Sequence, residues 1–526
     1  MIPGAITARP LHKVPVAHRI PSSTRRMARR VIPSGTSNRV PLHWDQVKDD
    51  PEWAEIERKW QGYAESNSLD KIAKDFQEMV GPILAEIQLS DYVSDLRSKA
   101  PSTPGSGAGP NPPTTLQWVD LVLAGGALLG VAHVGYILAL ESVGIRFRAL
   151  AGTSAGAMAA VLLAGLRESP EAAAGEALLL KLLDLPVPSF KDGLPADKAL
   201  GDALIGLLTR SGISWSTWTR LPLFPWALAR IWKNGGVHPG KTLYDWVHGV
   251  LAANRAGTLG QLRSKCDLSA VKFEKVPDVE SVEDRPLEGL VVAVAADVTT
   301  STKAALSWER PFNPATRPLT VSELYWTDPD SESPAACVRA SVSIPIFFQP
   351  YIVPADPALA LPGAGVPANT LPNSKWSEVG FDATIPDRVQ FQDGGLLSCF
   401  PLNLFHVASG QQVRCPTFGV GLSDPRRAAS IGNLGELLAA ATATATNIQD
   451  YEFVSQNKEY KLLAQLVNVA GVPGLDFNLP IIGKYVLFHN GVLAARDFLM
   501  GGPGRAGFDW KYYKQLRVAL SNANRT

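Results

Sequence analysis

A serine flanked by glycines occupies the position in this chain that is most suggestive of chemistry. Residues 151–157 read AGTSAGA and contain the pattern Gly-x-Ser-x-Gly, with Gly152, Ser154 and Gly156 as its fixed residues. In this pattern a sharp turn between a strand and a helix exposes a serine hydroxyl, and both glycines let the backbone approach the nucleophile. The helix N-terminus also places partial positive charge where an oxyanion would form. The spacing therefore predicts a nucleophilic Ser154, although an ordinary glycine-rich turn can share the pattern.

A second glycine-rich turn lies upstream, in the stretch AGGALLG (124–130), which ends at Gly130. It follows the apolar run VDLVLAG (119–125), which predicts a buried strand. Glycine-rich turns at the carboxyl end of a strand present successive N–H groups to an anion. The turn lacks the Lys-Ser/Thr of a P-loop and does not match Gly-x-Gly-x-x-Gly. We therefore predict an oxyanion hole formed by the N–H groups of Gly125, Gly126, Ala127 and Ala155.

A carboxylate followed by two glycines is the third element. Asp393, Gly394 and Gly395 come directly after the strand-like run DRVQF (387–391) and Gln392. Alone, this pattern is equally typical of an ordinary turn. A carboxylate, with an unperturbed pKa of ~3.9, is a weaker base than histidine at ~6.5. It can still accept the proton of a serine when it is partly desolvated and held against the hydroxyl.

Histidine is the alternative base for Ser154, and His133 and His406 are the candidates. The order Ser154, Asp393, His406 is that of an α/β-hydrolase triad. Because His406 follows PLNLF (401–405), which predicts a helix leading away from the site, a packed or surface histidine is the simpler interpretation. A Ser–His–Asp esterase remains the alternative to a Ser–Asp pair.

The elements around these motifs predict an α/β fold. Residues 131–143 indicate a helix, FRALAG (147–152) a strand, and AGAMAAVLLAGL (155–166) a second helix. Strand, glycine-rich loop, helix, strand, turn and helix in this order are typical of a parallel sheet with crossover connections. The runs LVVAVAADV (290–298) and PTFGVGL (416–422) predict further buried strands.

The rest of the chain consists of segments that differ in composition and in apolar periodicity. Asp50-Pro51 predicts a helix start, and apolar residues then recur at helical spacing in two segments, first Trp53, Ile56, Trp60 and Tyr63, then Leu69, Ile72, Phe76 and Met79. We expect a basic, disordered tail over 1–44, a helical extension over 45–100, a Pro/Gly/Ser linker over 101–115, a catalytic domain over 116–430 with an inserted helical subdomain or lid over 207–265, and a C-terminal helical extension over 431–526 that packs on the catalytic domain.

Charge and cysteine content exclude several classes of function. The net charge is +1, which gives no signature of nucleic-acid binding, and the four cysteines are too scattered for a metal site or a disulfide framework. No apolar run is long enough to span a membrane. The tail carries eight basic residues and no acid before Asp45, so it is a transit peptide, a segment attracted to anionic membrane, or simply a solvated tail. We expect a cytoplasmic protein, peripheral at a membrane.

The tryptophan-rich segment 207–233 has two interpretations. It carries Trp215, Trp218, Trp226 and Trp232 among apolar and basic residues. Tryptophan favours the headgroup region of a bilayer, so the segment could anchor a lipid-facing lid. Burial in the core of the inserted subdomain is the simpler interpretation, because tryptophan side chains are usually mostly buried.

The three motifs, in this order, resemble those of the patatin-like phospholipases. Over residues 117–425 the stretches VRASVSIPIFFQP (338–350), QDGGLLSCFPLNLF (392–405) and GKTLYDWVHGVLAANRAGTLGQL (240–262) are also similar to the family, the last to its bacterial members. The resemblance implies a three-layer α/β/α domain and a lipid acyl hydrolase of the phospholipase A, lysophospholipase or esterase type. It implies Ser154 as nucleophile, Asp393 as base, a covalent acyl-enzyme, an acyl-lipid substrate, and neither metal nor organic cofactor.

The chain departs from the family pattern at three positions. Ala127 stands where the family loop has its third glycine, Leu129 where it has Arg or Lys, and Cys399 where it often has Asn. If the loop requires positive φ at Ala127, alanine carries strain that glycine avoids. These departures leave open a degenerate fold that serves as a membrane or interaction module, which the retention of Ser154 and Asp393 argues against.

Overall fold

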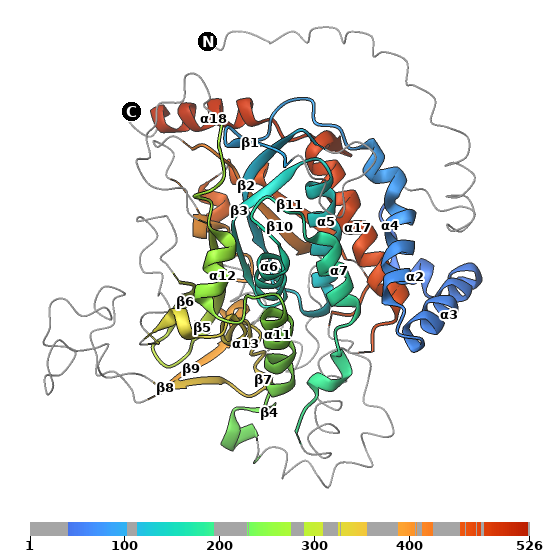
Figure 1. Ribbon diagram of the computed structural model, residues 1–526, viewed down its shortest axis with the longest axis vertical. Helices are drawn as coiled ribbons and strands as arrows, with labels where there is room; N and C mark the ends of the chain where they lie inside the picture. Colours follow the sequence, from blue (N-terminus) through green and yellow to red (C-terminus); the bar gives the residue numbers. More distant parts are fainter. Residues whose placement is uncertain are drawn as a thin grey trace, which may run out of the picture. The chain divides into compact units, whose positions relative to one another are not determined.

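The computed structural model (Figure 1) describes residues 40–101, 113–193, 229, 231–274, 289–308, 325–326, 328–354, 388–405, 407, 413–423, 453–457, 459–469, 471–474 and 478–523. The tail before residue 40, three of the four tryptophans of segment 207–233 (Trp215, Trp218 and Trp226) and His406 lie outside these residues, so the expectations for them stay predictions.

A nine-stranded mixed sheet forms the centre of the described structure. Its strands run in the order β11 (Ala464–Asn468), β10 (Thr417–Ser423), β2 (Thr115–Leu123), β3 (Ile145–Thr153), β5 (Leu290–Asp297), β9 (Arg388–Asp393) and β8 (Tyr351–Pro354), with β1 (Arg97–Lys99) beside β2 and β6 (Thr302–Leu306) beside β5. The successive pairs from β11 through β10, β2 and β3 to β5 are parallel, whereas β1 runs antiparallel to β2, β6 to β5, and β9 to both β5 and β8.

The parallel strands are buried because helices cover the sheet on both faces. β5 is buried along its whole length, as expected for an apolar run within a parallel sheet. Some polar side chains of these strands are buried too: both carboxylate oxygens of Asp120 on β2 accept hydrogen bonds from the guanidinium of Arg148 on β3, at 2.8 and 2.6 Å. The predicted strands at β2, β3, β5, β9 and β10 are confirmed.

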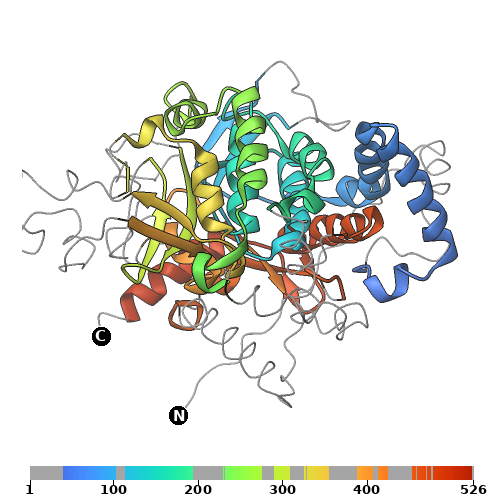
Figure 2. The same ribbon diagram turned by 90° about the horizontal axis from the view of Figure 1, so that it is seen from below.

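Side chains of β10 show which helices lie on which face. Successive residues of a strand point to opposite faces. Phe418 stacks on Phe498 of α17 (Ile481–Met500) at 4.7 Å between ring centroids, whereas the adjacent Thr417 lines a small space with Tyr513 and Arg517 of α18 (Trp510–Ala523). The sheet therefore lies between α17 and α18, and Figure 2 shows the three layers. The predicted α/β/α fold class is confirmed.

Three crossover and connecting helices accompany α17. These are α5 (Val131–Ser142), α6 (Ala155–Leu166) and α7 (Gly175–Leu183), and α5 packs along α17 while α6 packs on β3 and β5. Further elements are β4 (Gly236–His238), α11 (Lys241–Ala253), α12 (Leu259–Cys266), α13 (Pro334–Ser341), β7 (Ile346–Phe348), α16 (Tyr460–Leu463), β12 (Gly501–Gly502) and β13 (Arg505–Ala506).

The two predicted N-terminal helices are present and pack on α17. After α2 (Trp44–Val47), α3 (Pro51–Glu65) begins where Asp50 accepts the N–H of Glu52 at 2.8 Å, and α4 (Leu69–Glu86) follows. Trp60 of α3 and Phe76 of α4 surround Tyr485 of α17, with ring centroids 5.7 and 5.0 Å away. The apolar periodicity therefore marked the faces that α3 and α4 bury.

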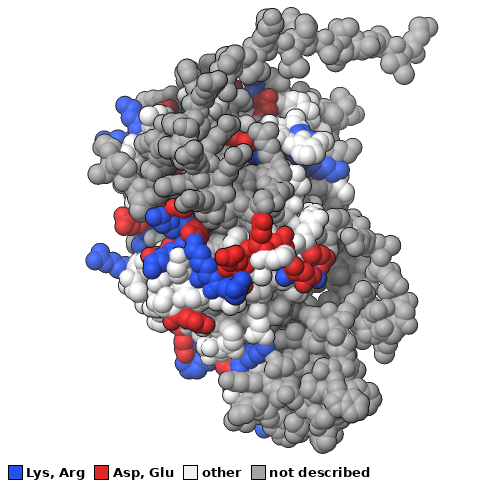
Figure 3. Space-filling view, turned by 90° about the vertical axis from the view of Figure 1, so that its right-hand side faces the viewer, with Lys and Arg blue, Asp and Glu red and all other residues white. Residues whose placement is uncertain are grey.

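The surface of α3 and α4 carries both signs of charge. This face turns toward the viewer in Figure 3, where Lys and Arg side chains lie next to Asp and Glu side chains across its described part. Lys59 of α3 and Asp75 of α4 form one such pair at 2.7 Å. Among the described helices, no segment is long and apolar enough to cross a bilayer.

Candidate active site

The turn at Ser154 explains the spacing of the glycines around it. β3 ends at Thr153 and α6 begins at Ala155, so Ser154 is the single residue between strand and helix, with φ 53° and ψ −120°. A Cβ at Gly152 would lie 2.2 Å from the carbonyl carbon of Gly156, and a Cβ at Gly156 would lie 2.2 Å from the carbonyl oxygen of Leu123. Only glycine fits at either position, and the crowding holds the serine in a conformation that L-residues rarely adopt.

Ser154 and Asp393 are joined directly. The hydroxyl of Ser154 donates a hydrogen bond to Oδ2 of Asp393 at 2.6 Å, and both residues are buried. They stand at the ends of β3 and β9, which pair with successive residues along the same edge of β5, Thr153 with Val294 and Asp393 with Ala295, while β6 pairs along the other edge. Adjacent strand ends thus bring together a hydroxyl and a carboxylate that are far apart in the sequence.

The environment of Asp393 suits a proton acceptor. Burial raises the pKa of its carboxyl to about 6, while hydrogen bonds from the Ser154 hydroxyl and the Gly395 N–H act in the opposite direction. The Gly395 N–H donates to Oδ1 at 2.8 Å and fixes the carboxylate plane. A Cβ at Gly394 would lie 2.1 Å from the carbonyl oxygen of Val294, which accounts for the first glycine after the aspartate. A desolvated carboxylate of this pKa is a stronger base than a solvated one.

The last residue of α13 and the segment that follows it hold both residues in place. The N–H of Ser154 donates to Oγ of Ser341 at 2.8 Å, and the Ser341 hydroxyl donates to the carbonyl of Val294 at 2.6 Å. The N–H of Asp393 donates to the carbonyl of Ser343 at 2.8 Å. No local sequence pattern predicted a role for Ser341 or Ser343. Their only signal was the likeness of stretch 338–350 to the family.

The N–H groups of the glycine-rich turn differ in whether they already donate to an acceptor in the fold. The N–H of Gly125 donates to the carbonyl of Cys399 at 2.8 Å, so it is not free to bind an oxyanion in this conformation. The N–H groups of Gly126, Ala127 and Ala155 find no acceptor within the described residues. Ala127 has φ 48°, so this position does require the left-handed region that glycine enters without strain.

His133 packs beneath the glycine-rich turn. It is fully buried on α5, its Nε2 lies 2.8 Å from the carbonyl oxygen of Ala124, and burial lowers its pKa to about 4. The hydroxyl of Ser154 donates to Asp393. His133 therefore supports the turn rather than taking a proton from the serine.

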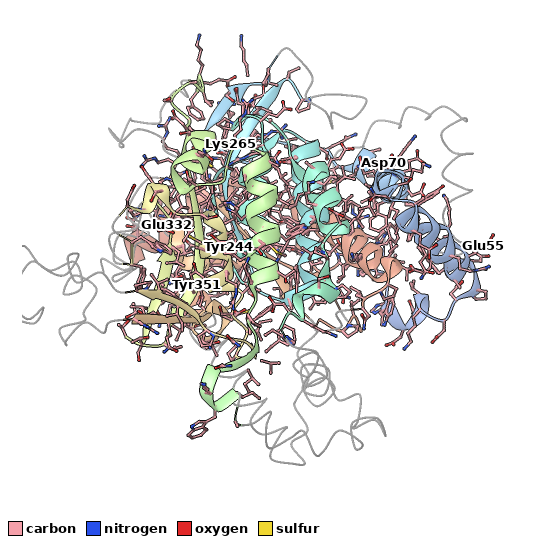
Figure 4. The ribbon with its side chains drawn as sticks, turned by 60° about the horizontal axis from the view of Figure 1, so that its bottom comes forward. Glu55, Asp70, Tyr244, Lys265, Glu332 and Tyr351 are labelled. Carbon is pink, nitrogen blue, oxygen red and sulfur yellow. The ribbon has the colours of Figure 1, made fainter. Side chains whose placement is uncertain are left out.

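A second group of ionisable side chains comes from three other elements (Figure 4). Tyr244 lies on α11, Glu332 just before α13 and Tyr351 on β8. Burial raises the pKa of both Glu332 and Tyr351, which favours their protonated forms. Within the described residues no cluster of three or more His, Cys, Asp or Glu side chains is arranged to hold a metal ion.

Comparison with known proteins places the chain in a family. The family model described as Patatin-like phospholipase matches residues 121–406. The chain belongs to the patatin-like phospholipases. The matched region contains the glycine-rich turn, Ser154, Ser341 and Asp393, whereas α17 and α18 lie beyond it. Membership points to lipid acyl hydrolysis, as the motifs had indicated.

Individual relatives of this patatin-like phospholipase are distant. An uncharacterized protein of Bacillus subtilis (strain 168), YqhO, is 25% identical over 385 residues, which cover 73% of this chain and 98% of that protein. Among solved structures, VipD from Legionella pneumophila is 13% identical with a TM-score of 0.31 and covers 78% of this chain and 70% of its own. ExoU in complex with SpcU, from Pseudomonas aeruginosa, is 16% identical with a TM-score of 0.24, covering 77% and 58%.

Proposed function

We propose that this patatin-like phospholipase hydrolyses carboxylic esters of acyl lipids through a Ser154–Asp393 dyad. The observation that carries the proposal is the 2.6 Å hydrogen bond from the Ser154 hydroxyl to a buried carboxylate whose pKa is about 6. Near neutral pH such a carboxylate is mostly ionised and can accept the serine proton as the hydroxyl attacks.

The reaction has two halves, each with Asp393 moving one proton. In the first, Oγ of Ser154 attacks the ester carbonyl while Asp393 takes its proton. The tetrahedral intermediate then expels the alcohol, which receives that proton, and an acyl-serine ester remains. In the second half, Asp393 takes a proton from water, the resulting hydroxide attacks the acyl-serine, and Ser154 leaves with the proton. The products are an alcohol and a carboxylic acid.

The negative charge of each tetrahedral intermediate needs hydrogen-bond donors nearby. The N–H groups of Gly126, Ala127 and Ala155, which have no acceptor among the described residues, belong to the glycine-rich turn and the first turn of α6 on either side of the serine. The N-terminus of α6 adds the positive end of its dipole at the same place. Backbone donors need no particular side chain, so Ala127 and Leu129 leave the reaction class unchanged.

Activity-based labelling tests the proposal. A fluorophosphonate probe reacts with an activated serine, so it should label the wild type and lose all labelling in Ser154→Ala. Ser264→Ala is the matched control, because Ser264 is an exposed serine on α12 whose hydroxyl bonds only to the carbonyl of Gly260. Labelling that persists in Ser154→Ala would refute the nucleophile. Loss of activity in His406→Ala with unchanged folding would favour the Ser–His–Asp alternative.

A further inference from the structure

Arg339 is a buried cation close to the proposed base. It lies in the last turn of α13, two residues before Ser341, and only 3% of its surface is exposed. Burial lowers the pKa of its guanidinium to about 10, and the charge of Asp192 opposes this. Arginine is rarely buried unless its charge or its donors are paired. The hydrogen bonds of Arg339 therefore indicate what it does.

The guanidinium of Arg339 binds three points of the chain at once. Nη1 donates to Oγ of Ser343 at 2.5 Å, whereas Nη2 donates to the carbonyl oxygens of Pro239 and Gln349, each at 2.7 Å. Pro239 directly follows β4, and Gln349 directly follows β7. Because the donors of a guanidinium form a planar, rigid fork, they fix these three acceptors relative to α13.

The segment 343–349, which Arg339 contacts at both ends, also holds the backbone of the base. The Asp393 N–H donates to the carbonyl oxygen of Ser343 at 2.8 Å. The pKa of Asp393 is set by burial and by hydrogen bonds from Ser154 and Gly395. The influence of Arg339 on Asp393 therefore runs through the backbone of this segment, so it concerns the position of the carboxylate and not its charge.

The surroundings of the Arg339 guanidinium fit its shape. A Cβ at Gly240 would lie 2.3 Å from Nε, and Gly240 has φ 72°, so only glycine fits there. The ring centroid of Phe348 lies 5.0 Å from the central carbon, within the range of a cation–π contact. Asp192 accepts the N–H groups of Gly240 and Thr242 at 2.9 and 3.0 Å, which fixes the start of α11 beside the guanidinium.

We propose that Arg339 is a positioning residue for Asp393: its guanidinium holds the segment 343–349 against β4, and the Ser343 carbonyl in that segment holds the Asp393 backbone. The proposal rests on the proposed function for the role of Asp393 as base. A displacement of about 1 Å at a reacting group can cost about a hundredfold in rate. Ser343→Ala removes one of the three bonds and leaves the segment tied at Gln349, whereas loss of the guanidinium removes all three.

Substitution of Arg339 by lysine tests the proposal by kinetics. Arg339→Lys keeps the charge but replaces the fork with a single ammonium, so kcat on a short soluble ester should fall about tenfold and KM should stay within about twofold. Arg167→Lys is the matched control. Arg167 is also a buried arginine that donates to a carbonyl, but at Phe147, near the start of β3 and away from Ser154. It should lose stability and retain kcat. A wild-type kcat in folded Arg339→Lys, or an equal fall in both variants, would overturn the proposal.

Amide hydrogen exchange separates the positioning of Asp393 from the chemistry of Ser154. In Arg339→Lys the Asp393 N–H, whose acceptor is the Ser343 carbonyl, should exchange about tenfold faster than in the wild type, while exchange in β10 stays unchanged. Unchanged exchange at Asp393 would refute the proposal. If the wild type hydrolyses no ester but Arg339→Lys still speeds this exchange, the proposed function fails while the positioning role stands.

A milder substitution covers the case in which Arg339→Lys does not fold. Phe348→Leu removes only the ring beside the guanidinium and leaves its three acceptors in place. Loss of the cation–π contact should lower kcat about threefold and speed exchange of the Asp393 N–H by a similar factor. No change in either quantity would overturn the proposal.

Discussion

The hydroxyl of Ser341 links the backbone of Ser154 to that of Val294. It accepts the Ser154 N–H at 2.8 Å and donates to the Val294 carbonyl at 2.6 Å. Strained backbone of the kind found at Ser154 costs on the order of 1–3 kcal/mol and persists only when its surroundings fix it. Ser341 is one of the contacts that fix it, and it ties the turn to β5, the strand with which both β3 and β9 pair.

Removing that contact should slow the reaction without weakening substrate binding. We expect Ser341→Ala to lower kcat about tenfold and to leave KM nearly unchanged, because a misplaced nucleophile affects mainly the transition state. Ser343→Ala is the matched control: it also deletes a buried serine hydroxyl, here one that bonds to Arg339, but keeps the backbone carbonyl that Asp393 uses. It should lose stability and retain kcat. Equal effects of both substitutions on kcat would contradict a positioning role.

The dyad predicts non-additive kinetics. Ser154→Ala and Asp393→Asn should each remove nearly all ester hydrolysis, and the double variant should be little worse than either, because the two side chains act as a unit. The measurement is kcat/KM of the three variants on a soluble ester. Losses that multiply would mean that the two residues act independently.

The pKa of Asp393 predicts the acid limb of the pH profile. The carboxylate accepts the serine proton only when ionised, so activity should rise with pH and reach half its plateau near the pKa of about 6. At one pH unit below this pKa, about one-tenth of the molecules carry an ionised Asp393, so kcat/KM should fall about tenfold. The profile is measured on a short soluble ester from about pH 4 to about pH 8. A plateau that persists well below the pKa would argue against Asp393 as the base.

The positive φ of Ala127 predicts the effect of replacing this residue by glycine. Its φ of 48° costs an alanine about 1 kcal/mol or more, and glycine avoids that cost. We expect Ala127→Gly to preserve or raise kcat, because the N–H remains and the loop relaxes. The measurement pairs kcat with thermal unfolding. A large fall in kcat with unchanged unfolding would show that the loop does not bind the oxyanion.

The basic tail predicts salt-dependent membrane binding. The eight basic residues lie before residue 40, whereas Leu42 exchanges backbone hydrogen bonds with the Asn490 side chain, so deleting 1–39 removes the charge and keeps the packing. Each basic residue near an anionic surface contributes roughly 1 kcal/mol, and salt screens it. The deletion should weaken binding to phosphatidylserine vesicles at low salt and leave soluble-ester hydrolysis intact. Unchanged binding would exclude the tail as an anchor.

The tryptophan-rich segment predicts a contribution that salt does not screen. Replacing Trp218 and Trp226 by Ala should reduce vesicle hydrolysis even at high salt if they face lipid, because burial of apolar side chains does not depend on screening. Hydrolysis of a soluble ester and circular dichroism are measured alongside. An unfolded double variant would instead identify both as core residues.

The sequence predicted the central strands and a nucleophilic Ser154 because both leave local patterns, whereas Asp393 as the base was implied by the resemblance to the family. An apolar run such as LVVAVAADV marks a buried strand, and the glycines beside Ser154 and Asp393 mark close backbone approach. Other features depend on contacts that no local pattern reports. The Ser341 contact joins residues distant in the chain, and the N–H of Gly125 is taken by a carbonyl that only the fold brings near. The segment 431–526, expected to be helical, also supplies β11 to the sheet, because a short strand of mixed polarity has no distinct periodicity.

The pairing of β3 and β9 with one edge of β5 has a consequence for how this protein can change during evolution. The separation of Ser154 and Asp393 is set by the pairing of β3 and β9 with adjacent residues of β5, and not by the chain of more than two hundred residues that connects them. Insertions or deletions in those connections can therefore remodel the surrounding surface while the Ser154 hydroxyl and the Asp393 carboxylate keep their distance. Changes in loop length alone could therefore alter the substrate range of the proposed hydrolase while the Ser154–Asp393 pair stays the same.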